Sequence, residues 1–224
     1  HSAAMTQTLT RILPHHAAAL GILVLVLVLL TPSVAATTCV APKSLSTTNT
    51  LLPVGAPDQL LFSKAVLGHV NFQRCLEGLH GVENHTGLTS AAAVHAGWMA
   101  GHSTLSHVST VSGQSTVTQR VKSVLDDART GTENIGYVHR YRVDEGQVFY
   151  AGADDCSFKT ASGRKIGSHS YSSLAERIVT LWMNSPGHRR NLLDRNASFS
   201  GSALAFDPNA AHCGVYYMSQ EFAG

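Results

Sequence analysis

The 224-residue chain is poor in charge: Asp, Glu, Lys and Arg make up 13% of it, and the formal net charge is +2. No run of lysine or arginine forms a stripe that would neutralise a phosphate backbone, so we expect no nucleic-acid partner. Several enzyme motifs are also missing. The absence of an HExxH helix, a GxSxG elbow and any CxxC pair argues against a zinc-protease helix, a serine-hydrolase elbow and a thiolate zinc or redox site.

The longest apolar run stands near the N-terminus, from Ala17 to Leu30, after the basic side chain of Arg11. Residues 1–4 precede the first methionine and are interpreted as an upstream remnant. The run suits a signal-peptide core and is shorter than the roughly 20 residues that cross a bilayer, so a membrane anchor or a buried helix is the weaker alternative. Ser33-Val34-Ala35 offers a cleavage site. We therefore predict a signal peptide over residues 5–36 and a secreted protein, extracellular or periplasmic, with no stable transmembrane segment after cleavage.

All the cysteines follow the predicted cleavage site, at Cys39, Cys75, Cys156 and Cys213. An even number in an exported chain indicates two disulfides, and three connectivities are open. Pairing Cys39 with Cys75 and Cys156 with Cys213 keeps each bridge within a neighbouring part of the expected fold.

The exported part divides into a tether and a domain. Residues 37–58 are rich in Thr, Ser and Pro, which is typical of an extended tether. Residues 59–224 are long enough for one domain with a single core. Periodicity and capping signals predict helices over residues 60–79, 90–102 (capped by Thr89 or Ser90), 115–129 and from the box Ser173–Glu176 to about Asn184, where Pro186 and Gly187 end the helix.

The C-terminal part alternates as strands do. Residues 202–206 and 214–222 flank a turn at Asp207-Pro208-Asn209 and predict a hairpin, and a shorter strand is expected near residues 147–150. Helices together with hairpin-connected strands predict an α+β fold, a three-layer α-β-α sandwich with a mostly antiparallel central sheet.

Beyond periodicity, five motifs occur in order along the chain. They are VNFQR (residues 70–74), AAAVHAGWMAGHSTLSH (91–107), TENIGY (132–137), LWMNSPGHRRNLL (181–193) and YYMSQEF (216–222). The ordered set resembles the bacterial secreted branch of the CAP superfamily, which includes the cysteine-rich secretory and pathogenesis-related 1 proteins and is also called the SCP domain. The resemblance covers residues 60–222 and implies that residues 59–224 form one CAP domain.

The resemblance also implies a central cleft with two histidines and two acids. His107 and His188 match the two histidines and Glu133 matches the first acid, whereas the position of the second acid is Ser185. We therefore expect a ligand cleft formed by His107, Glu133, Ser185 and His188. Because one acid is missing, any mechanism that needs two carboxylates is weakened.

Two imidazoles with one carboxylate suggest a metal site. His107 and His188 are the candidate metal ligands, and a weakly held zinc ion is the expected cofactor, since a catalytic zinc usually has three protein ligands. Glu133 would either orient one ring or hold a water, and in the second role it is the candidate general base. The alternative for each histidine, taken singly, is a helix cap or a partner for a buried carbonyl.

Three classes of function compete. The first is a binding module for an extracellular ligand: a lipid, a sterol-like molecule, a wall component or a protein. The second is a metal-assisted, peptidase-like hydrolase using His107, His188 and Glu133, and the third is a structural role at the cell envelope. Other prominent residues are expected to be structural: Asn71 and Arg74 as pins for the first helix, Trp98 and Trp182 in the core, and His95 and His102 on an exposed helix face.

Overall fold

The computed structural model describes residues 38–43, 47–152 and 156–224, and they form one compact unit, Thr37–Gly224. The predicted signal peptide, residues 5–36, lies outside the described residues. Among the residues that are described, no helix combines the length and the apolar character that a membrane span requires.

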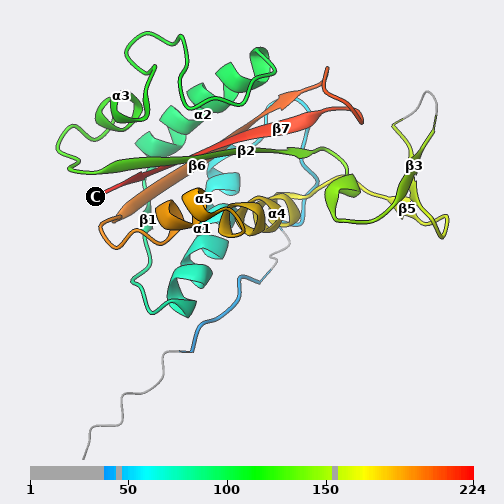
Figure 1. Ribbon diagram of the computed structural model, residues 1–224, viewed down its shortest axis with the longest axis horizontal. Coiled ribbons are helices and arrows are strands. Elements are labelled where there is room, and N and C mark those ends of the chain that lie inside the picture. The colour runs from blue at the N-terminus through cyan, green and yellow to red at the C-terminus, as the bar shows by residue number, and fades with distance from the viewer. Residues whose placement is uncertain (1–37, 44–46, 153–155) are drawn as a thin grey trace, which may run out of the picture. The chain divides into compact units, whose positions relative to one another are not determined.

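A four-stranded sheet in the order β1-β6-β7-β2 lies at the centre of the described unit (Figure 1). Its strands are β1 (Glu83–Asn84), β2 (Gly131–His139), β6 (Phe199–Asp207) and β7 (Val215–Ala223). β7 pairs antiparallel with both β6 and β2, while the short β1 runs parallel to β6. The predicted hairpin and the mostly antiparallel sheet are therefore confirmed.

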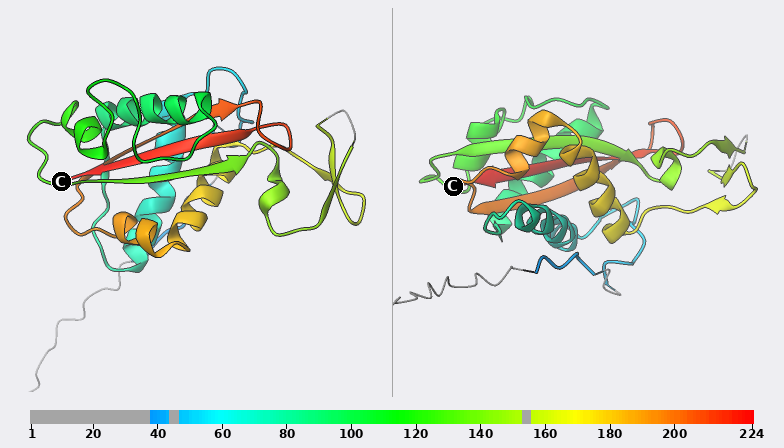
Figure 2. Two further views of the ribbon diagram at one scale, coloured as in Figure 1. Left: turned by 45° about the horizontal axis from the view of Figure 1, so that its top comes forward. Right: turned by 60° about the horizontal axis from the view of Figure 1, so that its bottom comes forward.

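Helices cover both faces of this sheet (Figures 1 and 2). One face carries α2 (Thr86–Gly101) and α3 (Val117–Lys122), and the other carries α1 (Gln59–Leu76), α4 (Tyr171–Met183) and α5 (Pro186–Leu192). The three-layer α-β-α sandwich of the α+β class is thus the observed fold. A second, three-stranded sheet forms an arm beside it, with β3 (Phe149–Ala151), β4 (Phe158–Thr160) and β5 (Lys165–Ile166), preceded by the 3₁₀ turn η1 (Arg142–Asp144).

The helix ends differ from those that the sequence predicted. α2 begins at Thr86, and its N-cap residue is His85, whose ring accepts a hydrogen bond from the Leu88 N–H. The sequence had predicted a later start, with Thr89 or Ser90 as the cap. α4 is capped by a reciprocal box of Ser170 and Ser173 rather than by Ser173 and Glu176.

Two further helices depart from the prediction. α3 stops at Lys122 instead of reaching residue 129, and the chain continues in turns that still bury Ala128 in the same apolar cluster as Val121. α5 was missed: Pro186, interpreted as a terminator, occupies the first turn of a new helix, where its missing N–H costs nothing.

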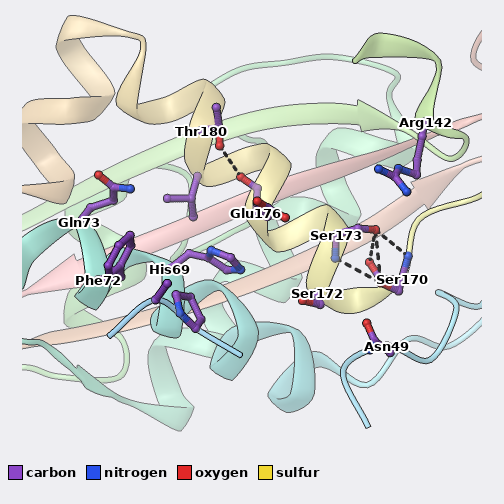
Figure 3. Close-up of a pocket in the computed structure, with 13 residues that line it drawn as sticks. Asn49, His69, Phe72, Gln73, Arg142, Ser170, Ser172, Ser173, Glu176 and Thr180 are labelled. Carbon is purple, nitrogen blue, oxygen red and sulfur yellow. Dashed lines mark hydrogen bonds between the residues drawn. The ribbon is translucent and has the colours of Figure 1, made fainter. Parts of the chain in front are cut away.

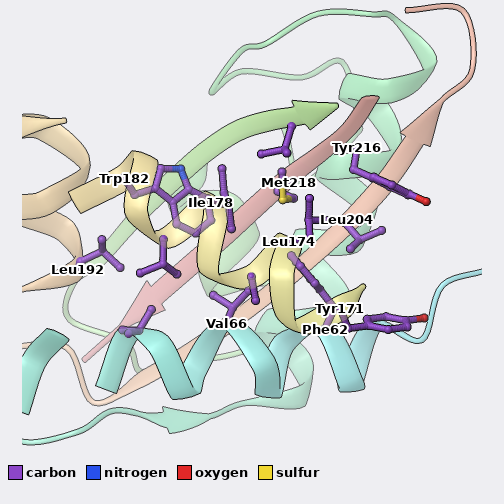
Figure 4. Packing of buried hydrophobic residues seen from close by; sticks show 14 of the residues in the cluster. Phe62, Val66, Tyr171, Leu174, Ile178, Trp182, Leu192, Leu204, Tyr216 and Met218 are labelled. Carbon is purple, nitrogen blue, oxygen red and sulfur yellow. The ribbon is translucent and has the colours of Figure 1, made fainter. Parts of the chain in front are cut away.

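The main core lies between α1, α4 and the sheet (Figure 4). Phe62 and Val66 on α1 and Ile178 on α4 are almost fully buried there, as is Trp182 at the end of α4. The Trp182 Nε1–H donates to the carbonyl oxygen of Ile135 in β2 at 2.9 Å. This bond fixes α4 against the edge strand that carries Glu133. Trp98, by contrast, is only half-buried.

The segment predicted to be a tether is bonded onto the domain in its described part, residues 38–43 and 47–58, which we call the N-terminal strap. The Leu52 N–H donates to the carbonyl oxygen of His169 at 3.1 Å, and the hydroxyl of Tyr216 donates to the carbonyl oxygen of Pro53 at 3.1 Å. Burial raises the pKa of Tyr216 to about 12, so this phenol keeps its proton and remains a donor. The strap is therefore extended but held in place.

Two disulfides, Cys39–Cys75 and Cys156–Cys213, close the described unit, each with a Cα–Cα distance of 5.7 Å. Of the three connectivities that the sequence left open, these two bridges form the one in which each bridge stays within a neighbouring part of the fold. The first bridge anchors the strap to the end of α1, and the second joins the arm to the turn between β6 and β7. Such bridges persist in oxidising compartments, in agreement with export.

Arg74 pins the end of α1, as the sequence suggested. Its guanidinium is almost fully buried and donates to the carbonyl oxygens of His80, Leu192 and Asp194 at 2.8 to 2.9 Å. Asn71 bonds both the N–H and the carbonyl of Val82. These side chains form hydrogen bonds with backbone groups that have no partner within the sheet or the helices.

We predict that Arg74→Met lowers the free energy of unfolding by about 3 kcal/mol, because buried carbonyls lose their only charged donor. The measurement is urea denaturation followed by circular dichroism. The matched control is Arg190→Met, which removes an exposed guanidinium that forms no hydrogen bond with the described residues and should change stability by less than about 0.5 kcal/mol. Equal effects of the two variants would contradict the assignment.

Candidate functional site

His107 and Glu133 are in direct contact. His107 lies in the loop after α2, and its Nδ1 is 2.7 Å from Oε1 of Glu133 in β2. The imidazole is 52% exposed, whereas the Glu133 side chain has no exposed surface. An ionised carboxylate can only accept, so Nδ1 carries a proton, and Nε2 of the half-exposed ring makes no hydrogen bond with the described residues.

The second oxygen of Glu133 is also occupied. Oε2 accepts from Arg120 Nη2 at 2.6 Å and from the Ser219 hydroxyl at 3.1 Å, and the His95 Nε2 lies 3.6 Å away. Burial alone would raise the pKa of Glu133, but the hydrogen bond from His107, the neighbouring Glu221 and the positive charge of Arg120 outweigh it and lower the pKa. Glu133 is therefore a buried, ionised and fully bonded carboxylate.

Glu221 in β7 is a second buried carboxyl beside the first. Its Oε1 accepts from Arg120 Nε at 3.0 Å, while its Oε2 has no hydrogen-bond partner among the described residues. Burial and the negative charge of Glu133 raise the pKa of Glu221 well above its usual value. One guanidinium therefore balances one ionised carboxylate, Glu133, and the environment of Glu221 favours its protonated form.

His188 lies in the first turn of α5, half-buried. Two amide side chains fix α5 against β2: Asn134 donates to the carbonyl oxygen of His188 at 3.3 Å, and Asn191 donates to the carbonyl oxygen of Glu133 at 2.9 Å. Burial, and then the proximity of His107, lower the pKa of His188. The fold thus brings the two histidines into electrostatic contact beside Glu133.

Ser185 is the N-cap residue of α5, and its side chain makes no capping hydrogen bond. It is half-buried and supplies no carboxylate to the cleft. Within residues 38–43, 47–152 and 156–224, no group of three or more His, Cys, Asp or Glu side chains is placed to hold a metal ion. The site therefore offers a half-exposed imidazole at His107, a half-buried residue at His188 and one fully buried carboxylate.

The sequence analysis missed four members of this cluster: His95, Arg120, Ser219 and Glu221. The expectation that His95 is exposed was wrong: it is 1% exposed, and its Nε2 donates to the carbonyl oxygen of Ser106 at 2.8 Å. A usable signal was present in β7, where Ser219, Gln220 and Glu221 form a polar stretch in a strand that is buried throughout. A charged residue in such a strand indicates a buried partner of opposite charge.

A comparison with known families assigns this architecture to a class. The profile of the cysteine-rich secretory protein family, CAP, matches residues 67–222, which is most of the chain. The chain therefore belongs to the CAP family. No curated protein matches the chain significantly.

Several solved structures are similar to it. An extracellular protein containing an SCP domain from Bacillus anthracis is 17% identical with a TM-score of 0.49, over 74% of this chain and 41% of that one. An outer surface protein from Borrelia burgdorferi is 14% identical with a TM-score of 0.48, over 74% and 94% of the two chains. A cysteine-rich secretory protein from Staphylococcus aureus is 18% identical with a TM-score of 0.45, over 76% and 40%. The chain thus spans about two fifths of the first and the third, and the family assignment rests on the profile alone.

We predict that the proton on Glu221 makes stability fall as the pH rises. The folded chain keeps a proton that the unfolded chain loses above the ordinary value of 4.5, so the folded state binds more protons and unfolding becomes easier at higher pH. Relative to Glu221→Gln, the wild type should lose up to about 1.4 kcal/mol per pH unit above that value.

Urea denaturation of both proteins between about pH 5 and pH 8 measures the difference. Asp126→Asn, a change at an exposed carboxyl, should run parallel to the wild type. Parallel curves for wild type and Glu221→Gln would show that Glu221 is ionised in the folded protein.

Proposed function

We propose that this CAP protein is an exported binding module whose ligand meets the His107–His188 pair, and that a divalent metal such as zinc is held weakly by the two rings. The observation that carries the proposal is the 2.7 Å contact between His107 Nδ1 and Glu133 Oε1. A carboxylate that holds one ring nitrogen fixes the tautomer and the orientation of the ring and increases the basicity of the other nitrogen.

The protonation states favour the same role. A histidine ligates a metal through an uncharged nitrogen, and the lowered pKa of His188 keeps this ring neutral near neutral pH. His107 has its lone pair on Nε2 because Nδ1–H is bonded to Glu133. The neutral form of each ring can therefore offer a nitrogen lone pair to a metal ion or to a hydrogen-bond donor.

The available ligands fit a metal ion only in part, so we expect the affinity for the metal to be low. Two imidazoles supply fewer ligands than the three of a usual catalytic zinc site, and Ser185 adds no carboxylate. The remaining positions would be filled by water or by the ligand itself. A bound metal would contribute Lewis acidity toward an oxygen of the ligand.

The hydrolase alternative has less support. A general base needs a reachable lone pair, but Glu133 has no exposed surface and both of its oxygens are bonded to His107, Arg120 and Ser219. Its position suits the orientation of His107. We therefore propose binding of an extracellular ligand as the function, the class that includes lipids, sterol-like molecules, wall components and proteins, ahead of hydrolysis.

We predict that calorimetric titration of the mature protein with zinc near neutral pH shows weak, saturable binding. The binding should be lost in His107→Ala and in His188→Ala. Glu133→Gln should weaken it by about 10- to 100-fold, because the ring loses its orienting carboxylate.

The matched control is His80→Ala, since His80 is an exposed histidine outside the cleft. Circular dichroism checks that each variant folds. If zinc does not bind, or if it binds His80→Ala and His107→Ala equally well, the metal-holding pair is ruled out.

A further inference from the structure

A second site lies away from the histidine cleft, in a pocket between α1, α4 and the N-terminal strap (Figure 3). Its volume is about 390 Å³, within the range of small-molecule sites. The side chains used below come from α1 (His69, Phe72, Gln73), from α4 (Ser172, Glu176) and from the strap (Pro42). None of the residues that form the His107 cluster lines it.

Polar side chains without internal partners line this pocket. The side chains of Gln73, His69 and Glu176 make no hydrogen bond or ion pair with the described residues; Gln73 and His69 are half-buried and Glu176 is exposed. Gln73 offers two donors and an acceptor, and Glu176 offers acceptors alone. Such groups, gathered in one hollow, can pair with the hydroxyl and amide groups of a ligand.

The charge of the lining points to an uncharged ligand. Burial lowers the pKa of His69, so this ring is neutral at neutral pH. The charged residues among the lining are Glu176 and Arg142, and Arg142 is already bonded to Glu145 at 2.6 Å. The two charges are opposite in sign and His69 is neutral, so the lining has no net charge, which favours an uncharged ligand over a phosphate or a carboxylate.

One wall of the pocket is apolar. The ring of Phe72, half-buried, lies beside Gln73 in Figure 3, and Pro42 lines the pocket from the strap. A ligand with a polar rim and an apolar face would contact both kinds of wall. Sugar rings have this form, with hydroxyl groups around the edge and C–H groups on the face.

The pocket is also built on rigid parts. α1 and α4 pack on the main core, the first turn of α4 is closed by the Ser170–Ser173 box, and the strap is anchored through Cys39–Cys75. Side chains that are already positioned lose less entropy when they bind. We propose that this pocket is a binding site for a neutral saccharide, with Gln73 and Glu176 bonding its hydroxyl or acetamido groups and Phe72 under its ring face.

A neighbouring hollow of about 440 Å³ shares Pro42, His69 and Ser172 with the pocket. The surface that lines it is mostly apolar and includes Leu61 and Ala65, and Lys43 and Lys64 also line it. It therefore suits an aliphatic group rather than a second sugar ring. An aliphatic probe can therefore be tested against the saccharides as the competing ligand.

The test uses two soluble neutral probes, N-acetylated chitotetraose and maltotetraose, and sodium laurate as the competing aliphatic probe. Saturation-transfer NMR detects binding to the mature protein, and amide shifts locate it. We expect one or both tetrasaccharides to bind, with shifts in α1 and α4 around Gln73 and Glu176. Glu176→Gln and Gln73→Ala should each weaken the affinity about tenfold, the loss expected for one good hydrogen bond.

Asp126→Asn is the matched control, since it removes an exposed carboxylate that does not line the pocket and should leave saccharide binding unchanged. Amide spectra establish that each variant is folded. The proposal is overturned if neither tetrasaccharide binds, if binding is the same in all variants, or if laurate binds in the pocket and the saccharides do not. Zinc binding at His107 is measured separately, so either proposal can fail without the other.

Discussion

The candidate cleft depends on one buried cation shared between two buried carboxyls. Arg120 in α3 donates to Glu133 in β2 and to Glu221 in β7, and its other N–H groups bond carbonyl oxygens in the loop between α2 and α3, at His107 and Gln114. A guanidinium leaves water only when its donors are satisfied, so these strands and this loop must close around it together. That closure places His107 against Glu133 and raises the pKa of Glu221, because burial and the charge of Glu133 disfavour its ionised form.

The rest of the scaffold keeps this cluster in place and adds a second surface. α5 is fixed to β2 by Asn134 and Asn191, which sets His188 beside His107. On the side of α1 and α4, the strap covers part of the helix pair and forms a polar pocket. The two sites use different elements, so the proposed metal at the histidines and the proposed saccharide in the pocket can be tested independently. Both suit an exported protein, whose disulfides hold the strap and the arm without a larger core.

The spacing of apolar residues predicted those helices and strands that bury only one face against the core. α1, α4 and the β6–β7 hairpin were predicted for this reason, and Ala128 is buried as expected although its helix ends at Lys122. Helix ends were predicted poorly, because a cap depends on which nearby side chain turns toward the backbone. His85 capped α2 in place of Thr89 or Ser90, and Pro186 began a helix instead of ending one.

The order of the motifs along the chain was sufficient for the family, and the contact between His107 and Glu133 agrees with the cleft that the motifs predicted. Ser185, read from the same alignment of motifs, already indicated that one carboxylate is missing. Only the tertiary structure showed the surroundings of these residues. Glu133 and His95 are buried, and Glu221 is a second buried carboxyl beside Glu133 that the sequence analysis did not predict. The reason is physical. The partners that set burial and charge at Glu133 and Arg120 are Ser219 and Glu221, 86 and 101 positions away, and no local pattern encodes such contacts.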